Sequence, residues 1–170
     1  MEKGNRGMAS VKGITLKGIK SFKGSHGHGM EASVWIDGKR LGRYYYPADG
    51  GDSTLTLTTP PIEEKFVERM SEFFDKYPSK LAGVDMFINV IMTMINLQKI
   101  YKDKLKLGYD ALVAENILAD IDAYIEDSNA SCYSVQTEGK AISDKALEAQ
   151  FAGEFRSFYV YRKPEDFDIL

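Results

Sequence analysis

The chain has 170 residues, 44% of them hydrophobic, and a formal net charge of −3, which suits one domain with one sizeable core and argues against two large domains. Its single cysteine, Cys132, excludes an internal disulfide framework and a zinc site built on several thiolates. No apolar run reaches the length of a membrane span, and the first ten residues lack the apolar centre of a signal peptide, so we expect a soluble intracellular protein.

Residues 11–23 predict a first strand with one irregularity. Ile14 and Leu16 share one face of an extended chain, whereas Ile19 falls on the opposite face if the alternation continues unbroken. A bulge near Lys17 and Gly18 would return Ile19 to the apolar face, because a bulge adds one residue to one strand of a pair.

A hairpin over residues 30–46 is the clearest local signal in the chain. Asp37-Gly38 separates two alternating runs and favours a two-residue turn, which pairs Trp35 with Arg40 and Glu31 with Tyr44. On this register Arg43 and Tyr45 lie on the core face, and the opposite, more polar face carries the aromatic row Trp35, Tyr44 and Tyr46.

The polar face of this hairpin has two interpretations. A loop or the N-terminal arm covers Trp35 in the first, since large aromatic side chains are usually mostly buried. In the second the face is a recognition surface, where Trp35 stacks with Arg40 in the combination of aromatic rings and arginine that interface hot spots favour. The candidate binding residues are then Trp35, Arg40, Arg43, Tyr44 and Tyr46.

Residues 53–59 alternate as a further strand, with Leu55 and Leu57 inward and threonines outward. Thr59 followed by Pro60 predicts the N-terminus of a helix that continues until Pro78.

A second helix, expected over about residues 81–105, is apolar nearly all round. Such a helix needs cover on several sides, so we expect it to cross the sheet with another helix or a second subunit behind it, which favours a homodimer. Its methionines suit a packed core, with a plastic ligand groove as the alternative.

The remaining residues predict shorter elements. Residues 109–127 fit a helix from about residue 112 through the spacing of Val113, Ile117 and Ile121, with a short strand at the start as the alternative. The sequence CYSVQT alternates as a strand, Ser143 suits the cap of a short helix through Phe151, and FRSFYVYR is a strong aromatic strand.

Charge and glycine content divide the chain near Pro60-Pro61. Residues 1–60 hold nine Lys or Arg against five acids, whereas residues 61–170 hold thirteen against twenty. We expect one domain over 1–170, made of a β-rich half (1–59), a helical half (60–127) and a strand-helix-strand part (128–170). The predicted fold class is α+β, with an antiparallel sheet of about four to six strands, rich in N-terminal hairpins, packed on one face by two or three helices.

A glycine- and histidine-rich loop links the first two predicted strands. It is a candidate phosphate or ligand loop through its backbone N–H groups, although it leads into a strand and lacks a helix dipole. His26 and His28 offer two nitrogens to a metal that Asp49 or Asp52 would complete, but an ordinary solvated turn is the preferred interpretation. The loop residues are Gly24, His26, Gly27, His28 and Gly29.

Common catalytic motifs are absent: the sequence holds no HExxH, GxSxG, P-loop or CxxC. The acidic run over residues 120–127 is typical of a solvated helix face, and Cys132 of a half-buried strand position. We therefore expect a protein that is not an enzyme and needs no metal or cofactor.

Basic and aromatic residues interleave in the β-rich half, which is typical of single-stranded nucleic-acid binding. The acidic chain as a whole argues against this, and the lysines also suit a mixed sheet. The residues are Lys12, Lys17, Lys20, Lys23, Lys39, Arg40 and Arg43, with Phe22, Trp35 and Tyr44.

The segments LKGIKSFKG and EASVWIDGKRLG, followed by a DGG turn, resemble the opening of small uncharacterised proteins encoded by bacteriophages and prophages. The resemblance covers roughly the first 55 residues, and the sequence departs from the pattern in its GSHGHG loop and in its long C-terminal part. It implies a phage accessory protein in the bacterial cytoplasm and transfers no catalytic residue.

Two functions follow as hypotheses. The first is a non-enzymatic binder that modulates or inhibits a host protein or a component of antiviral defence. The alternative is a protein that binds nucleotides or single-stranded nucleic acid through the basic, aromatic sheet and the glycine-rich loop.

Overall fold

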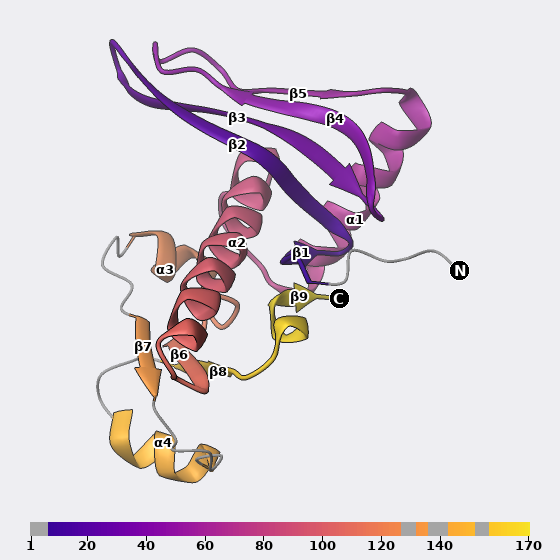
Figure 1. Ribbon diagram of the computed structural model, residues 1–170. Helices are drawn as coiled ribbons and strands as arrows, with labels where there is room; N and C mark the ends of the chain where they lie inside the picture. Colours follow the sequence, from indigo (N-terminus) through magenta and orange to yellow (C-terminus); the bar gives the residue numbers. More distant parts are fainter. Residues whose placement is uncertain (1–6, 127–131, 136–142, 152–156) are drawn as a thin grey trace.

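The computed structural model describes residues 7–126, 132–135, 143–151 and 157–170 and contains a six-stranded sheet, whose four longest strands form the upper part of Figure 1. The strand order is β5-β4-β3-β2-β1-β9, and every neighbouring pair is antiparallel except β1 with β9. The strands are β1 (Ser10–Val11), β2 (Ile14–Gly24), β3 (Gly27–Ile36), β4 (Lys39–Tyr46), β5 (Thr54–Leu57) and β9 (Asp168–Ile169).

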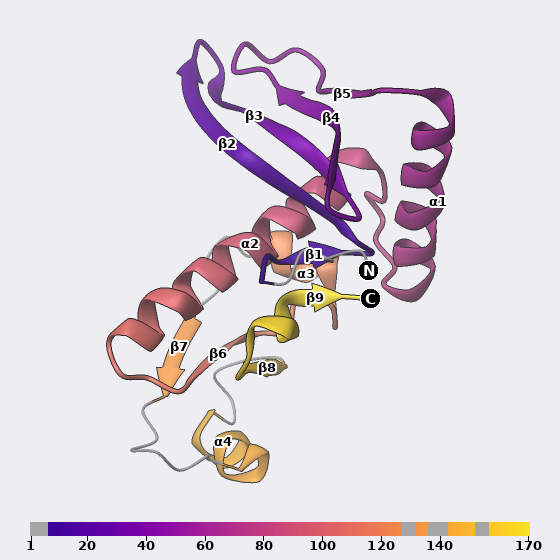
Figure 2. The same ribbon diagram turned by 45° about the vertical axis from the view of Figure 1, so that its right-hand side comes forward.

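Two long helices, α1 (Pro60–Lys76) and α2 (Val84–Lys106), lie on the same side of this sheet (Figures 1 and 2). Phe66 and Phe73 of α1 meet Phe87 of α2 with ring centres 5.6 Å apart in each pair, and all three are at most 1% exposed. We call the helix-covered side of the sheet its inner face and the other side its outer face. The α+β prediction, with an antiparallel sheet packed on one face by helices, is confirmed.

A smaller sheet covers the other side of α2. It has the order β7-β6-β8, with β7 (Cys132–Val135), β6 (Ala111–Glu115) and β8 (Phe158–Tyr161). The prediction of a helix from residue 112 is therefore wrong, and the short-strand alternative is right. Residues 111–114 are all buried, and a fully buried strand shows no alternation that would distinguish it from a buried helix.

Helix α2 therefore finds its cover within the chain. Its buried residues contact β1 and β2 on one side and β6 on the other, and the 3-10 helix η1 (Pro164–Phe167) packs against it as well. The expectation of another helix or a second subunit behind α2 is replaced by the small sheet and the C-terminal segment. The homodimer stays a prediction, but α2 no longer requires it.

The two ends of the described chain meet beside α2. Ser10 and Val11 of β1 pair in parallel with Asp168 and Ile169 of β9. Gln98 of α2, 4% exposed, accepts a hydrogen bond from the Ala9 N–H at 2.8 Å and donates one to the Gly7 carbonyl at 3.1 Å. The β-rich N-terminal half is thus completed by the last residues of the chain.

Several local predictions are confirmed. The register of β2 against β3 shifts between Lys17 and Lys20, and Gly18 has a φ of 61°, so the predicted bulge is present and Ile19 packs against the core. Helix α1 begins at Pro60, and Ser143 accepts a hydrogen bond from the Ala146 N–H at the start of α4 (Asp144–Phe151).

The turn between β3 and β4 is tied to α1. Asp37 adopts a φ of 50° in this turn, and its carboxylate accepts hydrogen bonds from both terminal guanidinium nitrogens of Arg69 at 2.7 Å. Lys65 adds a third hydrogen bond at 2.8 Å. Hydrogen bonds from Arg69 and Lys65 outweigh the effect of burial and hold the pKa of Asp37 well below its usual range.

No helix in the part of the chain that the structure describes is long and apolar enough to cross a membrane.

Candidate binding surfaces

The β3–β4 hairpin departs from its predicted register after two pairs. Trp35 faces Arg40 as expected, but a shift between Val34 and Trp35 makes Leu41 an extra residue, so that Ala32 faces Tyr44 and Glu31 faces Tyr45. A one-residue slip moves every later side chain of a strand to the other face. The predicted aromatic row is therefore wrong, because Tyr44 and Tyr46 lie on the inner face.

On the outer face, cations and aromatic rings lie in three rows that run across neighbouring strands, and Trp35 belongs to the first row. Trp35 pairs with Arg40, and the next row holds Lys17, Ser33 and Arg43. The cation over the indole is Lys17, with Nζ 3.9 Å from the ring centre, in place of the predicted Arg40. Trp35 is half-buried and its Nε1 donates a hydrogen bond to the Ser33 hydroxyl at 3.1 Å.

The third row of the outer face is held by one carboxylate. Glu31 lies between Lys20 and Tyr45, and it forms ion pairs with Arg43 and, at 3.9 Å, with Lys20. Tyr45 stacks on Phe22 with ring centres 5.7 Å apart and contacts the Arg43 guanidinium. Among the residues that the structure describes, the three rows hold four cations, Lys17, Lys20, Arg40 and Arg43, and one acid, Glu31.

The glycine- and histidine-rich loop forms the tip of the β2–β3 hairpin. His26 and His28 are exposed, and the His26 N–H donates to the Ala48 carbonyl at 2.8 Å, which joins this tip to the turn after β4. Gly27 has a φ of 107°, and the Phe22 ring lies over Gly29. Within the described residues, no three His, Cys, Asp or Glu side chains gather in a way that would hold a metal, so His26, His28 and Asp49 do not form the site that their types suggested.

A cleft of about 460 Å³ lies on the inner face, where the distal part of the sheet passes the first half of α2. Four residues singled out in the sequence meet there: Tyr44, Tyr46, His28 and Gly29. The apolar part of the wall is formed by Met30, Ile88 and Met92, and the polar part is completed by Ser21, Asp85 and Asn89.

The polar end of this cleft is organised by Asp85 in the first turn of α2. Its Oδ1 accepts hydrogen bonds from the Tyr44 hydroxyl at 2.7 Å and the Ser53 hydroxyl at 2.5 Å. Burial, followed by the hydrogen bond to Asp85, raises the pKa of Tyr44 above its usual value. Tyr44 therefore remains a neutral donor, and the cleft keeps one carboxylate.

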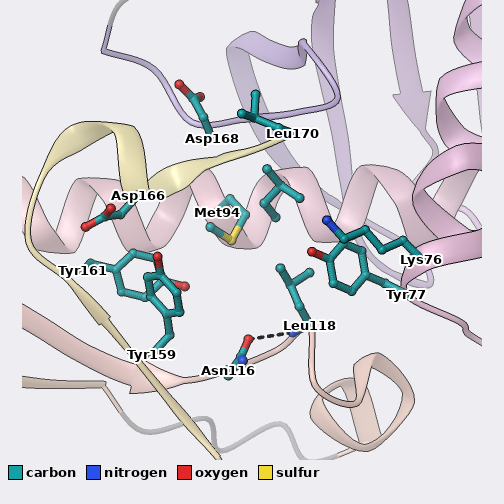
Figure 3. Close-up of a pocket in the computed structure, with 11 residues that line it drawn as sticks. Lys76, Tyr77, Met94, Asn116, Leu118, Tyr159, Tyr161, Asp166, Asp168 and Leu170 are labelled. Carbon is teal, nitrogen blue, oxygen red and sulfur yellow. Dashed lines mark hydrogen bonds between the residues drawn. The ribbon is translucent and has the colours of Figure 1, made fainter. Parts of the chain in front are cut away.

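A second pocket, of about 270 Å³, lies between the end of α1, α2, the small sheet and the C-terminal segment. Figure 3 shows Tyr159 and Tyr161 on one side of it, Lys76 and Tyr77 on the other, and Met94 and Leu118 between them. The Asn116 side chain accepts a hydrogen bond from the Leu118 N–H at 3.2 Å.

The acids around this second pocket are used by the fold. Asp166 accepts hydrogen bonds from the backbone N–H groups of Arg162 and Lys163, which fixes the turn at η1. Asp168 accepts one from the Ser10 hydroxyl at 3.0 Å and so joins β9 to β1, while burial raises its pKa. We interpret this pocket as a packing gap where several elements meet, because the hydrogen bonds of Asp166 and Asp168 serve to hold η1 and β9 in place.

The acidic run near residue 120 also has structural partners. Asp122 accepts hydrogen bonds from the Ser79 hydroxyl at 2.6 Å and the Lys80 N–H at 2.9 Å, and both lower its pKa. Asp120 accepts one from the Ala123 N–H at the start of α3 (Ile121–Glu126). Asp127 lies outside the described residues. These contacts tie α3 to the loop after α1 and fit an architectural role.

Sequence reasoning missed Asp85, Asn89 and Met92 as site residues. No local motif marks them, and they lie on the mostly apolar helix whose methionines had two interpretations. Met86 and Met94 are buried in the core, as the packed-core interpretation expects, whereas Met92 lines the cleft, where the ligand groove stays a prediction. The signal that separates them is the i, i+3 and i+4 relation of Asp85, Ile88, Asn89 and Met92, which places all four along one side of α2.

No family model, no curated protein and no solved structure matches this chain.

Proposed function

We propose that the protein is a non-enzymatic binding protein that recognises an acidic surface of a partner protein through the outer face of its six-stranded sheet. The observation that carries this proposal is the part of the outer face between Trp35 and Phe22, beyond Thr15, which is buried against Ala9. Its described residues include four cations and one carboxylate, together with Trp35, Tyr45 and Phe22, and both long helices lie on the opposite side (Figures 1 and 2).

The side-chain types favour a protein partner. Tryptophan, tyrosine and arginine are the residues that most often dominate binding energy at protein interfaces. The surplus of positive charge would speed association with an acidic partner and help to exclude basic ones. The phage-like opening of the sequence adds a class of partner, namely a bacterial host or defence protein, to this proposal.

Single-stranded nucleic acid is the alternative partner for the same face. Bases stack on aromatic side chains while cations contact phosphates. The outer face is less open to bases than its composition suggests, because Lys17 already covers Trp35 and Phe22 already stacks on Tyr45. Because Trp35 and Tyr45 already have these contacts within the chain, we favour a protein partner over stacked bases.

The test is a pull-down from the bacterial host with the wild-type chain and with Trp35→Ala/Arg40→Ala as baits. The matched control is Val67→Ala/Glu68→Ala, which changes two exposed residues of α1. We expect a captured protein that resists nuclease treatment and is lost only with the outer-face variant. Capture that is equal for all three baits would refute the proposal, and capture abolished by nuclease would assign the face to nucleic acid.

A salt titration with labelled single-stranded oligonucleotides separates the two partners directly. Nucleic-acid binding weakens steeply between about 50 and 200 mM salt, because phosphate contacts release counterions. We expect no saturable binding at the lower concentration.

A further inference from the structure

We propose that the inner-face cleft is a binding site for a small organic cation with an apolar body, such as an alkylammonium, guanidinium or quaternary ammonium group. The site lies on the opposite side of the sheet from the surface proposed above and does not depend on it. Its volume of about 460 Å³ is within the range of small-molecule sites in proteins.

The charge of the cleft selects the sign of the ligand. Among the described residues, the lining holds one carboxylate, Asp85, and one histidine, His28, and neither lysine nor arginine. Tyr44 and Ser53 both donate to Oδ1 of Asp85, and no described residue donates a hydrogen bond to its Oδ2. The second carboxylate oxygen is therefore the acceptor that remains for an ammonium or guanidinium group.

Tyr46 supplies the aromatic contact. It is 44% exposed, and no described ring or cation stacks on it. Its neighbour Tyr45, on the outer face, has both kinds of contact within the chain, from Phe22 and from Arg43. The Tyr46 ring therefore has no such partner among the described residues, and it lies on the side of the sheet that holds Asp85 and the cleft.

The walls suit the apolar body of the ligand. Met30 and Met92 contribute thioether side chains, and Ile88 lies one turn before Met92 on α2. Methionine adapts its shape to an irregular guest, and its sulfur is polarisable. An anionic ligand such as a nucleotide would instead be repelled by the Asp85 carboxylate, so we expect it to bind more weakly than a cation.

The experiment is a calorimetric titration of the full chain with agmatine, choline and tetramethylammonium, with AMP as the anionic comparison. The two test variants are Asp85→Asn, which keeps an acceptor for Tyr44 and Ser53, and Tyr46→Leu, which changes an exposed ring. Their matched controls are Asp52→Asn, an exposed acid in the turn after β4, and Tyr45→Leu on the outer face.

We expect at least one cation to bind with a Kd below about 1 mM, at least tenfold weaker binding for Asp85→Asn, and several-fold weaker binding for Tyr46→Leu, with both controls unchanged. Tyr46→Leu keeps the test decisive if Asp85→Asn fails to fold. Absence of saturable cation binding, equal loss in the controls, or tighter binding of AMP would overturn the proposal. Acetyl-arginine amide serves as a further arm: binding as tight as that of agmatine assigns the cation to a partner's side chain, and weaker binding assigns it to a free small molecule.

Discussion

The inner and outer faces of the large sheet are built from alternating residues of the same strands, yet they differ in what holds them. Val34 and Ile36 on the inner face are at most 1% exposed and pack against the helices. Between and beside them, Ser33, Trp35 and Arg43 on the outer face make hydrogen bonds, ring contacts and ion pairs in partial contact with water.

Along one strand, the inner-face residues are therefore expected to determine stability, and the outer-face residues are available for recognition. Removal of an inner contact exposes or empties a packed core, whereas removal of an outer contact exchanges a protein group for water. Substitutions on the two sides should therefore differ in free energy of unfolding by several kcal/mol, even where the side chains are chemically similar.

The strongest test of that separation is a pair of aromatic truncations. Phe87→Ala removes a fully buried ring that contacts Phe66 and Phe73, and we expect it to lower the free energy of unfolding by about 3–5 kcal/mol. Tyr45→Ala on the outer face should cost about 1 kcal/mol or less. Urea denaturation followed by circular dichroism measures both, and equal losses would contradict the separation.

A second test concerns the attachment of the N-terminal segment to α2. Gln98→Met keeps the length of the side chain but leaves the Ala9 N–H without its partner, while the Gly7 carbonyl keeps its hydrogen bond from Lys102, so we expect a loss of about 1–3 kcal/mol. Lys99→Met, at an exposed neighbouring position, should leave stability within about 0.5 kcal/mol. Hydrogen exchange of the Ala9 amide gives a local readout, and its protection should fall only in the Gln98 variant.

The third test uses pH at the clamp between the β3–β4 turn and α1. Asp37 has a lowered pKa in the folded state, so it releases its proton more readily there than in the unfolded chain. Its contribution is complete above the unfolded pKa of about 3.9 and is lost as the pH falls toward the lower folded value.

Asp37→Asn removes the charge and keeps a residue type that tolerates the positive φ of this turn. The side chain is 40% exposed and therefore screened, so we expect a loss of about 1 kcal/mol at pH 7. The stabilities of variant and wild type should converge as the pH falls below 4, whereas Glu64→Gln should give a pH-independent difference near zero. A difference between Asp37→Asn and wild type that stays constant from pH 7 to pH 2.5 would show that the ion pairs are not responsible.

The elements that the sequence predicted well have local causes. The bulge at Gly18 follows from a slip in apolar alternation, and the start of α1 follows from Thr59-Pro60. The missed features depend on partners far away in the chain. Strand β9 has two residues and pairs with β1 across almost the whole sequence, so no local pattern marks it.

The candidate surfaces were harder to predict, because one extra residue in β4, Leu41, determines which side chains lie on which face of the sheet. A strict two-residue hairpin places Arg43 on the core face, and the charge there was itself a warning against that register. The extra residue at Leu41 resolves the conflict: it moves Arg43 and Tyr45 outward and Tyr44 inward to Asp85. The extra residue therefore divides one expected aromatic surface between the outer face and the inner cleft.

The smallest expected effect is the coupling between Lys17 and Trp35 on the outer face. With Nζ 3.9 Å from the ring centre, a double-mutant cycle of Lys17→Met and Trp35→Ala should give about 0.5–1 kcal/mol. The matched cycle of Lys20→Met with Trp35→Ala should give a value near zero, because Lys20 pairs with Glu31 in another row. A positive coupling means that a partner must displace Lys17 or use its charge to reach the indole. A coupling of zero would leave the ring face open and would remove the reason for preferring a protein partner over a stacked base.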